Sequence, residues 1–358
     1  MTTQPRLAYL DALRGLAAVY VAASHFAQAS PAIPPHWFLV FGGFGGSAVI
    51  LFFIISAFSL CMTCPLLPDG RVDTRTFYLR RLFRIAPLFW FMLALYAIGI
   101  LPRFFATSPI TPQAVLFDAL FLTNLTDYMK LGVVAAGWTV GVEMLFYALF
   151  PLFARMNVRG ALWLLGATLA LAVAYRALCG HYDFKTAAWY HYNAGFIHCL
   201  PVFVLGVACF AWTKERQISR KEGAWMLAGA CAGLAALILT NRAFDTLEGA
   251  YLQAPCYAAL LLGLRSYPLP LFVNDVTQYL GKISFSVYLV HMPIIAALKP
   301  AYVWVGNTMG WWVHYTAIWT VSVILTAACV LAMATLTYAL IERPGIALGR
   351  KLIGGIGK

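Results

Sequence analysis

Long apolar segments recur along almost the whole chain, and this pattern constrains the fold more than any other feature of the sequence. Of the 358 residues, 62% are hydrophobic and only 11% are charged, whereas an ordinary soluble domain carries about a quarter charged residues. A soluble fold of this length would leave large apolar patches exposed to water. The sequence therefore predicts an all-α, polytopic transmembrane helix bundle. It argues against a soluble enzyme, a disordered protein and a secreted disulfide scaffold.

Ten segments are long and apolar enough to be candidate spans. They are residues 10–30, 44–64, 85–101, 133–154, 159–179, 193–212, 224–241, 249–264, 281–299 and 311–341. A further segment, 112–126, is short and contains Asp118 and Asn124. We interpret it as a re-entrant or interfacial helix.

The distribution of Lys and Arg supports ten spans. With the N-terminus in the cytoplasm, 19 of the 25 basic residues fall on the cytoplasmic side, which is the bias expected of membrane proteins. The other six are Arg103, Lys130, Arg176, Lys185, Arg242 and Lys299. We therefore expect both termini in the cytoplasm and a first span that is retained rather than cleaved. We also expect one domain over 1–358, with a short basic tail at 345–358.

The first predicted span carries three ionisable residues, Asp11, Arg14 and His25. Such residues are expensive inside a bilayer and are functional candidates by default. Arg14 and His25 are eleven residues apart. They therefore share a helix face and lie about 16 Å apart along the axis at 1.5 Å per residue. A structural interpretation makes Arg14 an interfacial anchor and His25 a core residue, but their shared face favours a joint functional role.

Two arginines before the third span, Arg81 and Arg84, are three residues apart and lie on one helix face. Arginines at such positions often snorkel to the lipid headgroups. The guanidinium group also matches phosphate oxygens in shape and charge. Charge alone leaves both interpretations open, a membrane anchor and a phosphate clamp.

Glu143 lies deep in the fourth predicted span, five residues after Trp138 and four before Tyr147. A carboxylate at that depth needs a partner, and we expect His25 or an arginine to supply it. A purely structural ion pair is the alternative.

Polar residues also mark the last two spans. Ser284, Tyr288 and His291 are three or four residues apart and share one helix face, where helix–helix hydrogen bonding is the structural alternative. The segment Glu342-Arg343-Pro344 closes the last span, and a local ion pair followed by a helix-stopping proline accounts for it.

Taken together, these residues make the chain resemble the acyltransferase-3 family of integral membrane acyltransferases, over about residues 6–344. The matching positions are Arg14 and His25, Arg81 and Arg84, Trp138 with Glu143, Phe146 and Tyr147, Ser284 with Tyr288, Leu289 and His291, and Leu51-Phe52-Phe53 with Ser56-Ala57-Phe58. Ala57 replaces the family's usual glycine and Thr139 its usual serine. Each motif alone is weak, but five in family order are strong.

This resemblance implies transfer of an acyl group, usually acetyl, from cytoplasmic acyl-CoA to a hydroxyl group, usually on a cell-surface or lipid-linked carbohydrate. Acyl-CoA is then a co-substrate, and no bound cofactor is implied. The implied partners are acyl-CoA, a carbohydrate or glycolipid acceptor and the lipid bilayer, with no nucleic acid. The implied location is the bacterial inner membrane, and the chain looks like the stand-alone type without a fused esterase-like domain.

On this interpretation Arg14, Arg81 and Arg84 bind the CoA phosphates. His25 acts as general base on the acceptor hydroxyl or takes the acyl group itself first. Glu143 fixes the imidazole tautomer and stabilises the imidazolium ion. Supporting or substrate-contacting residues are Asp11, Trp138, Tyr147, Ser284, Tyr288 and His291. We expect no metal site, because the C-x-x-C segment Cys61–Cys64 has no second pair at ligand spacing.

A transporter or flippase of a lipid-linked or anionic solute is the rival interpretation, because buried His, Glu and Arg also build transport paths. Inverted repeats would favour it, and the sequence shows no repeat.

Overall fold

The computed structural model describes residues 7–30, 35, 38, 42, 44–102, 109–126, 131–179, 195–240, 247–310 and 315–354. Apart from one isolated β-bridge, the regular structure of these residues is helical, which confirms the predicted all-α class. The helices are α1 (Ala8–Ala29), α3 (Ser47–Thr63), α4 (Thr74–Ala97), α5 (Pro112–Ala119), η1 (Thr123–Leu125), α6 (Trp138–Phe153), α7 (Val158–Cys179), α9 (Phe196–Glu215), α10 (Arg220–Leu239), α11 (Leu247–Ser266), α12 (Asp275–Lys282), α13 (Ser284–Ala297), α14 (Lys299–Met309), α15 (Tyr315–Thr337), η2 (Tyr338–Glu342) and α16 (Arg343–Gly354).

Each predicted span overlaps one of these helices. Within the described residues, four helices are by themselves long and apolar enough to cross a membrane, or five if the bent α12–α13 pair forms one span. Large apolar side chains cover the outer faces of α7 and α10, where Trp163 and Trp225 are more than two-thirds exposed. The protein is therefore a helical integral membrane protein, and the count of ten spans stays a prediction.

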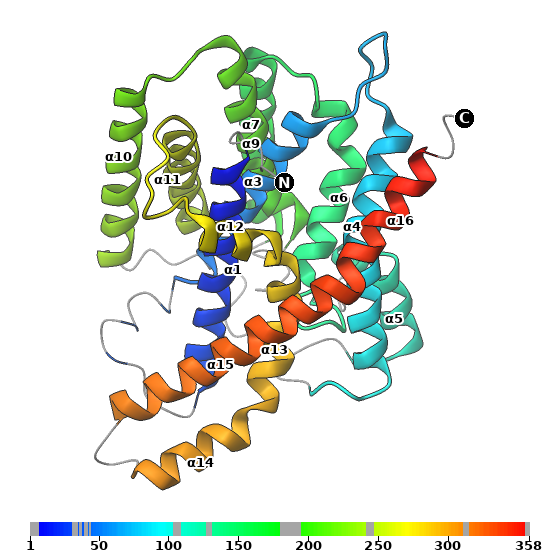
Figure 1. Ribbon diagram of the computed structural model, residues 1–358. Coiled ribbons are helices and arrows are strands. Elements are labelled where there is room, and N and C mark those ends of the chain that lie inside the picture. The colour runs from blue at the N-terminus through cyan, green and yellow to red at the C-terminus, as the bar shows by residue number, and fades with distance from the viewer. Residues whose placement is uncertain are drawn as a thin grey trace.

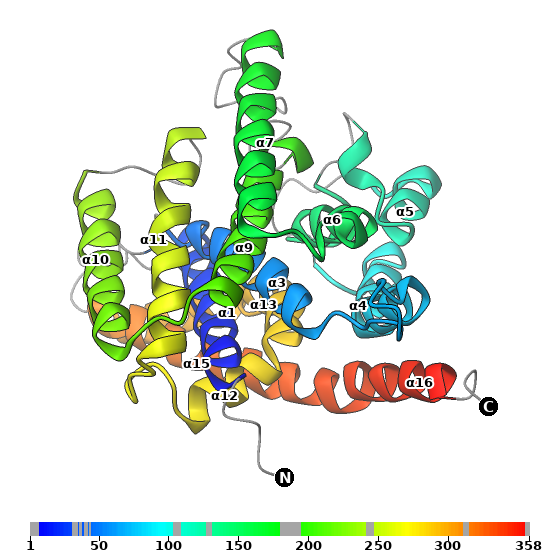
Figure 2. The same ribbon diagram turned by 90° about the horizontal axis from the view of Figure 1, so that it is seen from above.

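Helix α1 lies at the centre of the bundle and packs against α3, α11, α12, α13 and α15 (Figures 1 and 2). The closest approach is to α12, where a Cβ atom added at Gly281 would lie 1.8 Å from the Asp11 carbonyl oxygen. A small residue is required there, as is common where membrane helices touch. This contact brings the polar segment of α12–α13 against the charged face of α1.

The last long helix departs from our expectation. We predicted that Pro344 stops the last span and that Glu342 pairs with Arg343, and both predictions are wrong. The helix continues from α15 through the π-helical turn η2 into α16, and ends beside α4 (Figure 1). Pro344 is tolerated because it lies in the first turn of α16, where a missing backbone N–H costs little. Much of the predicted tail at 345–358 is thus helical.

The segment 112–126 forms the short helices α5 and η1 rather than a span. Its polar side chains accept hydrogen bonds from the backbone of other segments. The Asp118 carboxylate accepts hydrogen bonds from the N–H groups of Val133 and Val134 at 2.7 and 3.1 Å. Asn124 accepts one from the N–H of Phe196 at 2.7 Å. The loop at 180–190, which we predict to lie outside the cell, falls beyond the described residues.

Candidate active site

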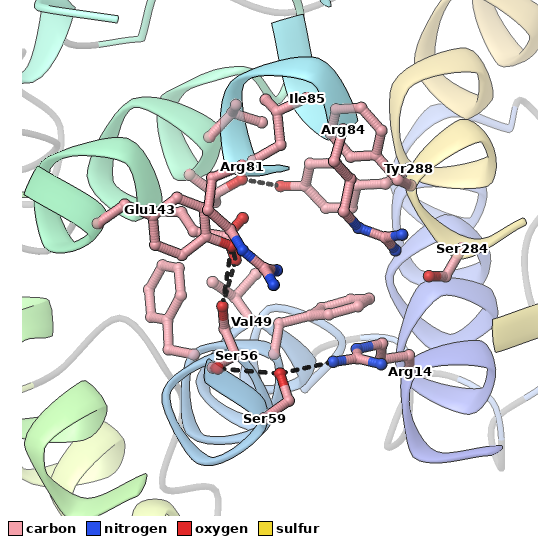
Figure 3. Close-up of a pocket in the computed structure, with 16 residues that line it drawn as sticks. Arg14, Val49, Ser56, Ser59, Arg81, Arg84, Ile85, Glu143, Ser284 and Tyr288 are labelled. Atoms are coloured by element: carbon pink, nitrogen blue, oxygen red, sulfur yellow. Dashed lines mark hydrogen bonds between the residues drawn. The ribbon is translucent and has the colours of Figure 1, made fainter. Parts of the chain in front are cut away.

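A cavity lies among α1, α3, α4, α6 and α13 and holds about 760 Å³ of space, counting the part open to solvent (Figure 3). Seven of the eleven residues singled out in the sequence line it. They are Arg14, Arg81, Arg84, Glu143, Tyr147, Ser284 and Tyr288. Residues separated by more than 250 positions in the chain thus meet at one site.

Arg14 is held at the cavity wall by two hydrogen bonds. It donates to the Asp11 carboxylate at 3.1 Å, one turn earlier on α1, and to the Ser59 hydroxyl on α3 at 2.7 Å. Asp11 therefore supports Arg14. Sequence analysis missed Ser59, although its spacing of three from Ser56 places the two hydroxyls near one face of α3.

Arg81 and Arg84 project from α4 toward the same space as Arg14 (Figure 3). Arg81 lies over the Tyr147 ring, 6.0 Å from its centroid, and its buried Nε has no hydrogen-bond partner. Neither Arg81 nor Arg84 forms an ion pair with another described residue. The described lining residues include one carboxylate, Glu143, against three guanidinium groups. The cavity therefore suits an anionic ligand.

The Glu143 carboxylate is fixed by two hydroxyl groups. Its Oε1 accepts hydrogen bonds from Ser56 and from Tyr147, each at 2.5 Å. Ser56 and Tyr147 are themselves 3.1 Å apart. Two donors on one oxygen hold the carboxylate against the cavity wall beside Arg81 (Figure 3). Ser56 belongs to a motif noted in the sequence, but its contact with Glu143 could not be seen there.

Tyr288 forms the wall of the cavity on the α13 side. Its hydroxyl donates to the Ala136 carbonyl at 3.1 Å and accepts from Thr139 at 2.8 Å. Ala136 adopts a positive φ of 61°, a conformation rare outside glycine. The loop before α6, which Asp118 anchors, thus positions the tyrosine.

Behind Tyr288 lie two histidines that do not line the cavity. Nδ1 of His25 is 2.8 Å from Nε2 of His291, and the two rings stack with centroids 5.1 Å apart. Nδ1 of His291 is 3.2 Å from the Val287 carbonyl oxygen. The His291 ring centroid is 5.7 Å from that of Tyr288. Tyr288 lines the cavity and contacts His291, and the fully buried His291 in turn contacts His25. The three side chains therefore form a continuous line of contacts that begins at the cavity wall.

This arrangement corrects the predicted role of Glu143. We expected Glu143 to hold the tautomer of His25, but its hydrogen bonds go to Ser56 and Tyr147. His291 takes the place beside His25 instead. The partner of His25 depends on which helix crosses α1 at its level. The spacing of residues along a single helix does not contain that information.

Two further residues complete the description of the site. Trp138 packs against the core and does not line the cavity. Glu342, which we had placed at the surface, is fully buried in η2 and accepts a hydrogen bond from Ser286 at 2.9 Å. Its signal in the sequence is its place directly after Ile341, the last apolar residue of the predicted span 311–341. Within the described residues, no three His, Cys, Asp or Glu side chains cluster as metal ligands would.

The chain is similar to known proteins over most of its length. A family model described as an acyltransferase domain matches residues 7–335. The exopolysaccharide production protein ExoZ of Rhizobium meliloti is 28% identical over 270 residues, 73% of this chain and 80% of ExoZ. Nodulation protein 10 of Rhizobium leguminosarum bv. viciae is 26% identical over 341 residues, 87% of this chain and 84% of that protein. No solved structure is significantly similar.

Proposed function

The chain belongs to the acyltransferase-3 family and is a membrane acyltransferase, and from this premise we propose that it moves an acetyl group from acyl-CoA to a hydroxyl group of a cell-surface or lipid-linked carbohydrate. The observation that carries the donor assignment is the convergence of Arg14, Arg81 and Arg84 on one cavity. CoA is rich in phosphate, and guanidinium groups bind phosphate through paired hydrogen bonds. The name of ExoZ, which refers to exopolysaccharide production, supports a carbohydrate acceptor.

The proposal includes a topology. The protein is a single domain that crosses a bacterial inner membrane ten times with both termini in the cytoplasm. The positive-inside bias supports this arrangement, which places the arginine cavity toward cytoplasmic acyl-CoA. Cysteine labelling tests it: a Gln217→Cys variant in a cysteine-free background should react only after the membrane is permeabilised. Labelling from outside intact cells would refute the ten-span arrangement.

The hydrogen bonds of the histidine pair support a role for Nε2 of His25 as the reacting nitrogen. A carbonyl oxygen can only accept, so Nδ1 of His291 donates to Val287. With both rings neutral, Nε2 of His291 then accepts from Nδ1–H of His25. Nε2 of His25 consequently carries the lone pair. This is the nitrogen that a general base or a nucleophile needs, and the second histidine fixes the tautomer and orientation of the first, as a carboxylate does in many hydrolases.

In the proposed reaction His25 acts first as a base and then as an acid. Nε2 of His25 removes the proton of the acceptor hydroxyl, and the hydroxyl oxygen attacks the thioester carbonyl carbon. The carbon–sulfur bond breaks, and the CoA thiolate leaves and takes a proton from the imidazolium ion. If the acyl group moves first to the imidazole, the same nitrogen is the nucleophile.

Purified protein in nanodiscs tests the function directly. It should bind acetyl-CoA, cleave its thioester slowly and transfer the acetyl group to the glycan lipids of its host, as measured by mass spectrometry. Movement of a labelled solute across vesicles without thioester cleavage would favour the transporter interpretation instead.

A further inference from the structure

A second hollow adjoins the active-site cavity, on the side where α16 packs against α4 (Figures 1 and 2). It holds about 700 Å³ of space, including its open mouth, and four arginines line it. The lining consists of Arg80, Arg81, Phe83 and Arg84 of α4 with Ile346, Gly349 and Arg350 of α16. No acidic side chain is among these residues. We call this hollow the α4–α16 groove.

The groove and the active-site cavity share two lining residues. Arg81 and Arg84 line both spaces, so one extended ligand can occupy the groove and reach past these side chains into the cavity. Helix α16 is held tightly in place, because a Cβ atom added at Gly349 would lie 2.6 Å from Cβ of Phe83. The close packing of α16 on α4 thus determines the shape of the groove.

The positive charges in the groove form no ion pair within the described part of the chain. Among the same residues, the buried Nε of Arg81 has no hydrogen-bond partner. Four cations this close repel one another and gain most from a ligand with several phosphates. Phe83 and Ile346 add apolar surface, on which a planar base can rest.

We propose that the α4–α16 groove holds the nucleotide end of the acyl-CoA donor, with Arg80 and Arg350 contacting the phosphates farthest from the thioester. The acyl arm then passes Arg81 and Arg84 into the active-site cavity. This inference rests on the proposed function and adds two binding residues to it. Arg350 lies beyond residues 7–335, so the family match does not assign it.

The test uses the full-length protein in zwitterionic nanodiscs and compares four variants. Arg80→Gln and Arg350→Gln remove groove charges. Arg75→Gln and Lys351→Gln are matched controls, because these exposed residues lie on the same two helices but do not line the groove. The readouts are the affinity for CoA and for 3′,5′-ADP, and KM for acetyl-CoA and for S-acetylpantetheine, which lacks the nucleotide.

We expect each groove variant to lose about three- to tenfold in affinity for CoA and 3′,5′-ADP, a value reduced from that of a buried charged bond because the groove is open. The controls should lose less than twofold, and KM for S-acetylpantetheine should not change. Equal losses in groove variants and controls would overturn the proposal, as would equal losses with S-acetylpantetheine.

Three further outcomes separate the alternatives. If the groove variants weaken association with spin-labelled phosphatidylglycerol and leave CoA affinity unchanged, an anionic lipid headgroup occupies the groove and the proposal is wrong. If the parent protein neither binds nor cleaves acetyl-CoA, the proposed function itself fails. A parent that transfers acetyl groups with unaltered CoA affinity in Arg350→Gln leaves the function intact and refutes only the groove.

Discussion

Arg14 and His25 lie on one helix, yet their surroundings differ in kind. Around Arg14, three guanidinium groups face an open cavity, and Arg81 and Arg84 form no ion pair within the described residues. Around His25, a buried histidine is hydrogen-bonded to a backbone carbonyl and to His25 itself. The first region gathers positive charge that suits an anionic ligand, and the second holds a pair of hydrogen-bonded imidazoles. If the proposed function holds, donor binding and proton transfer are therefore separated along α1.

The largest effect is expected when the imidazole of His25 is removed. His25→Ala should lower acetyl transfer by about 10²- to 10⁴-fold, the usual contribution of a general base. Donor affinity should stay within about twofold, since Arg14, Arg81 and Arg84 are unchanged. His25→Gln should be equally slow, because an amide cannot take up a proton. Transfer by mass spectrometry and CoA binding are measured on one folded preparation, and a parental rate in His25→Ala would remove this residue from the mechanism.

His291 tests whether the pair acts through its tautomer. His291→Phe keeps a ring but removes the acceptor for Nδ1–H of His25, and should lower kcat by about ten- to hundredfold. His291→Gln offers an amide oxygen as acceptor and should recover part of the rate, with KM for the donor unchanged in both variants. A purely structural role would instead make both variants unstable and equally slow.

The arginines should affect the other quantity. Arg81→Ala and Arg84→Ala should each weaken donor affinity by about tenfold, because each removes a charge-assisted bond to phosphate. Transfer at saturating donor should change by only a fewfold. Arg75→Ala, an exposed arginine on α4, is the control and should bind donor like the parent. If both cavity variants fold and bind CoA as tightly as the parent, the phosphate clamp does not exist.

Glu143 should give the smallest effect. Glu143→Gln keeps an oxygen that accepts from Ser56 and Tyr147, so the wall of the cavity is preserved. We expect a loss of only a fewfold in kcat and no loss of donor affinity. A loss approaching that of His25→Ala would restore the role that the sequence predicted for Glu143 and contradict the observed pairing.

Within one helix, residue spacing predicted which side chains lie on the same face. The spacing of Arg14 from His25 and of Arg81 from Arg84 determines which side chains share a face, and the structure brings all three arginines to one cavity. The all-helical membrane class followed from composition alone, because a soluble fold could not bury so much apolar surface.

The contacts between helices could not be predicted. His25 and His291 are 266 residues apart, and their pairing depends on how α13 crosses α1. Glu143 was assigned to the wrong partner for the same reason. Pro344 does not end the helix as predicted, because the π-helical turn before it shifts the register and the helix continues into α16.

We propose that α1 binds the donor at the level of Arg14 and performs the chemistry at the level of His25. The most direct test is one crossed experiment on His25→Ala, Arg84→Ala and the double variant, with donor affinity and single-turnover transfer at saturating donor measured for each. We predict that His25→Ala changes only the transfer rate, that Arg84→Ala changes mainly the affinity, and that the double variant shows both losses in full. A His25→Ala protein that loses donor affinity as strongly as Arg84→Ala would contradict the separation.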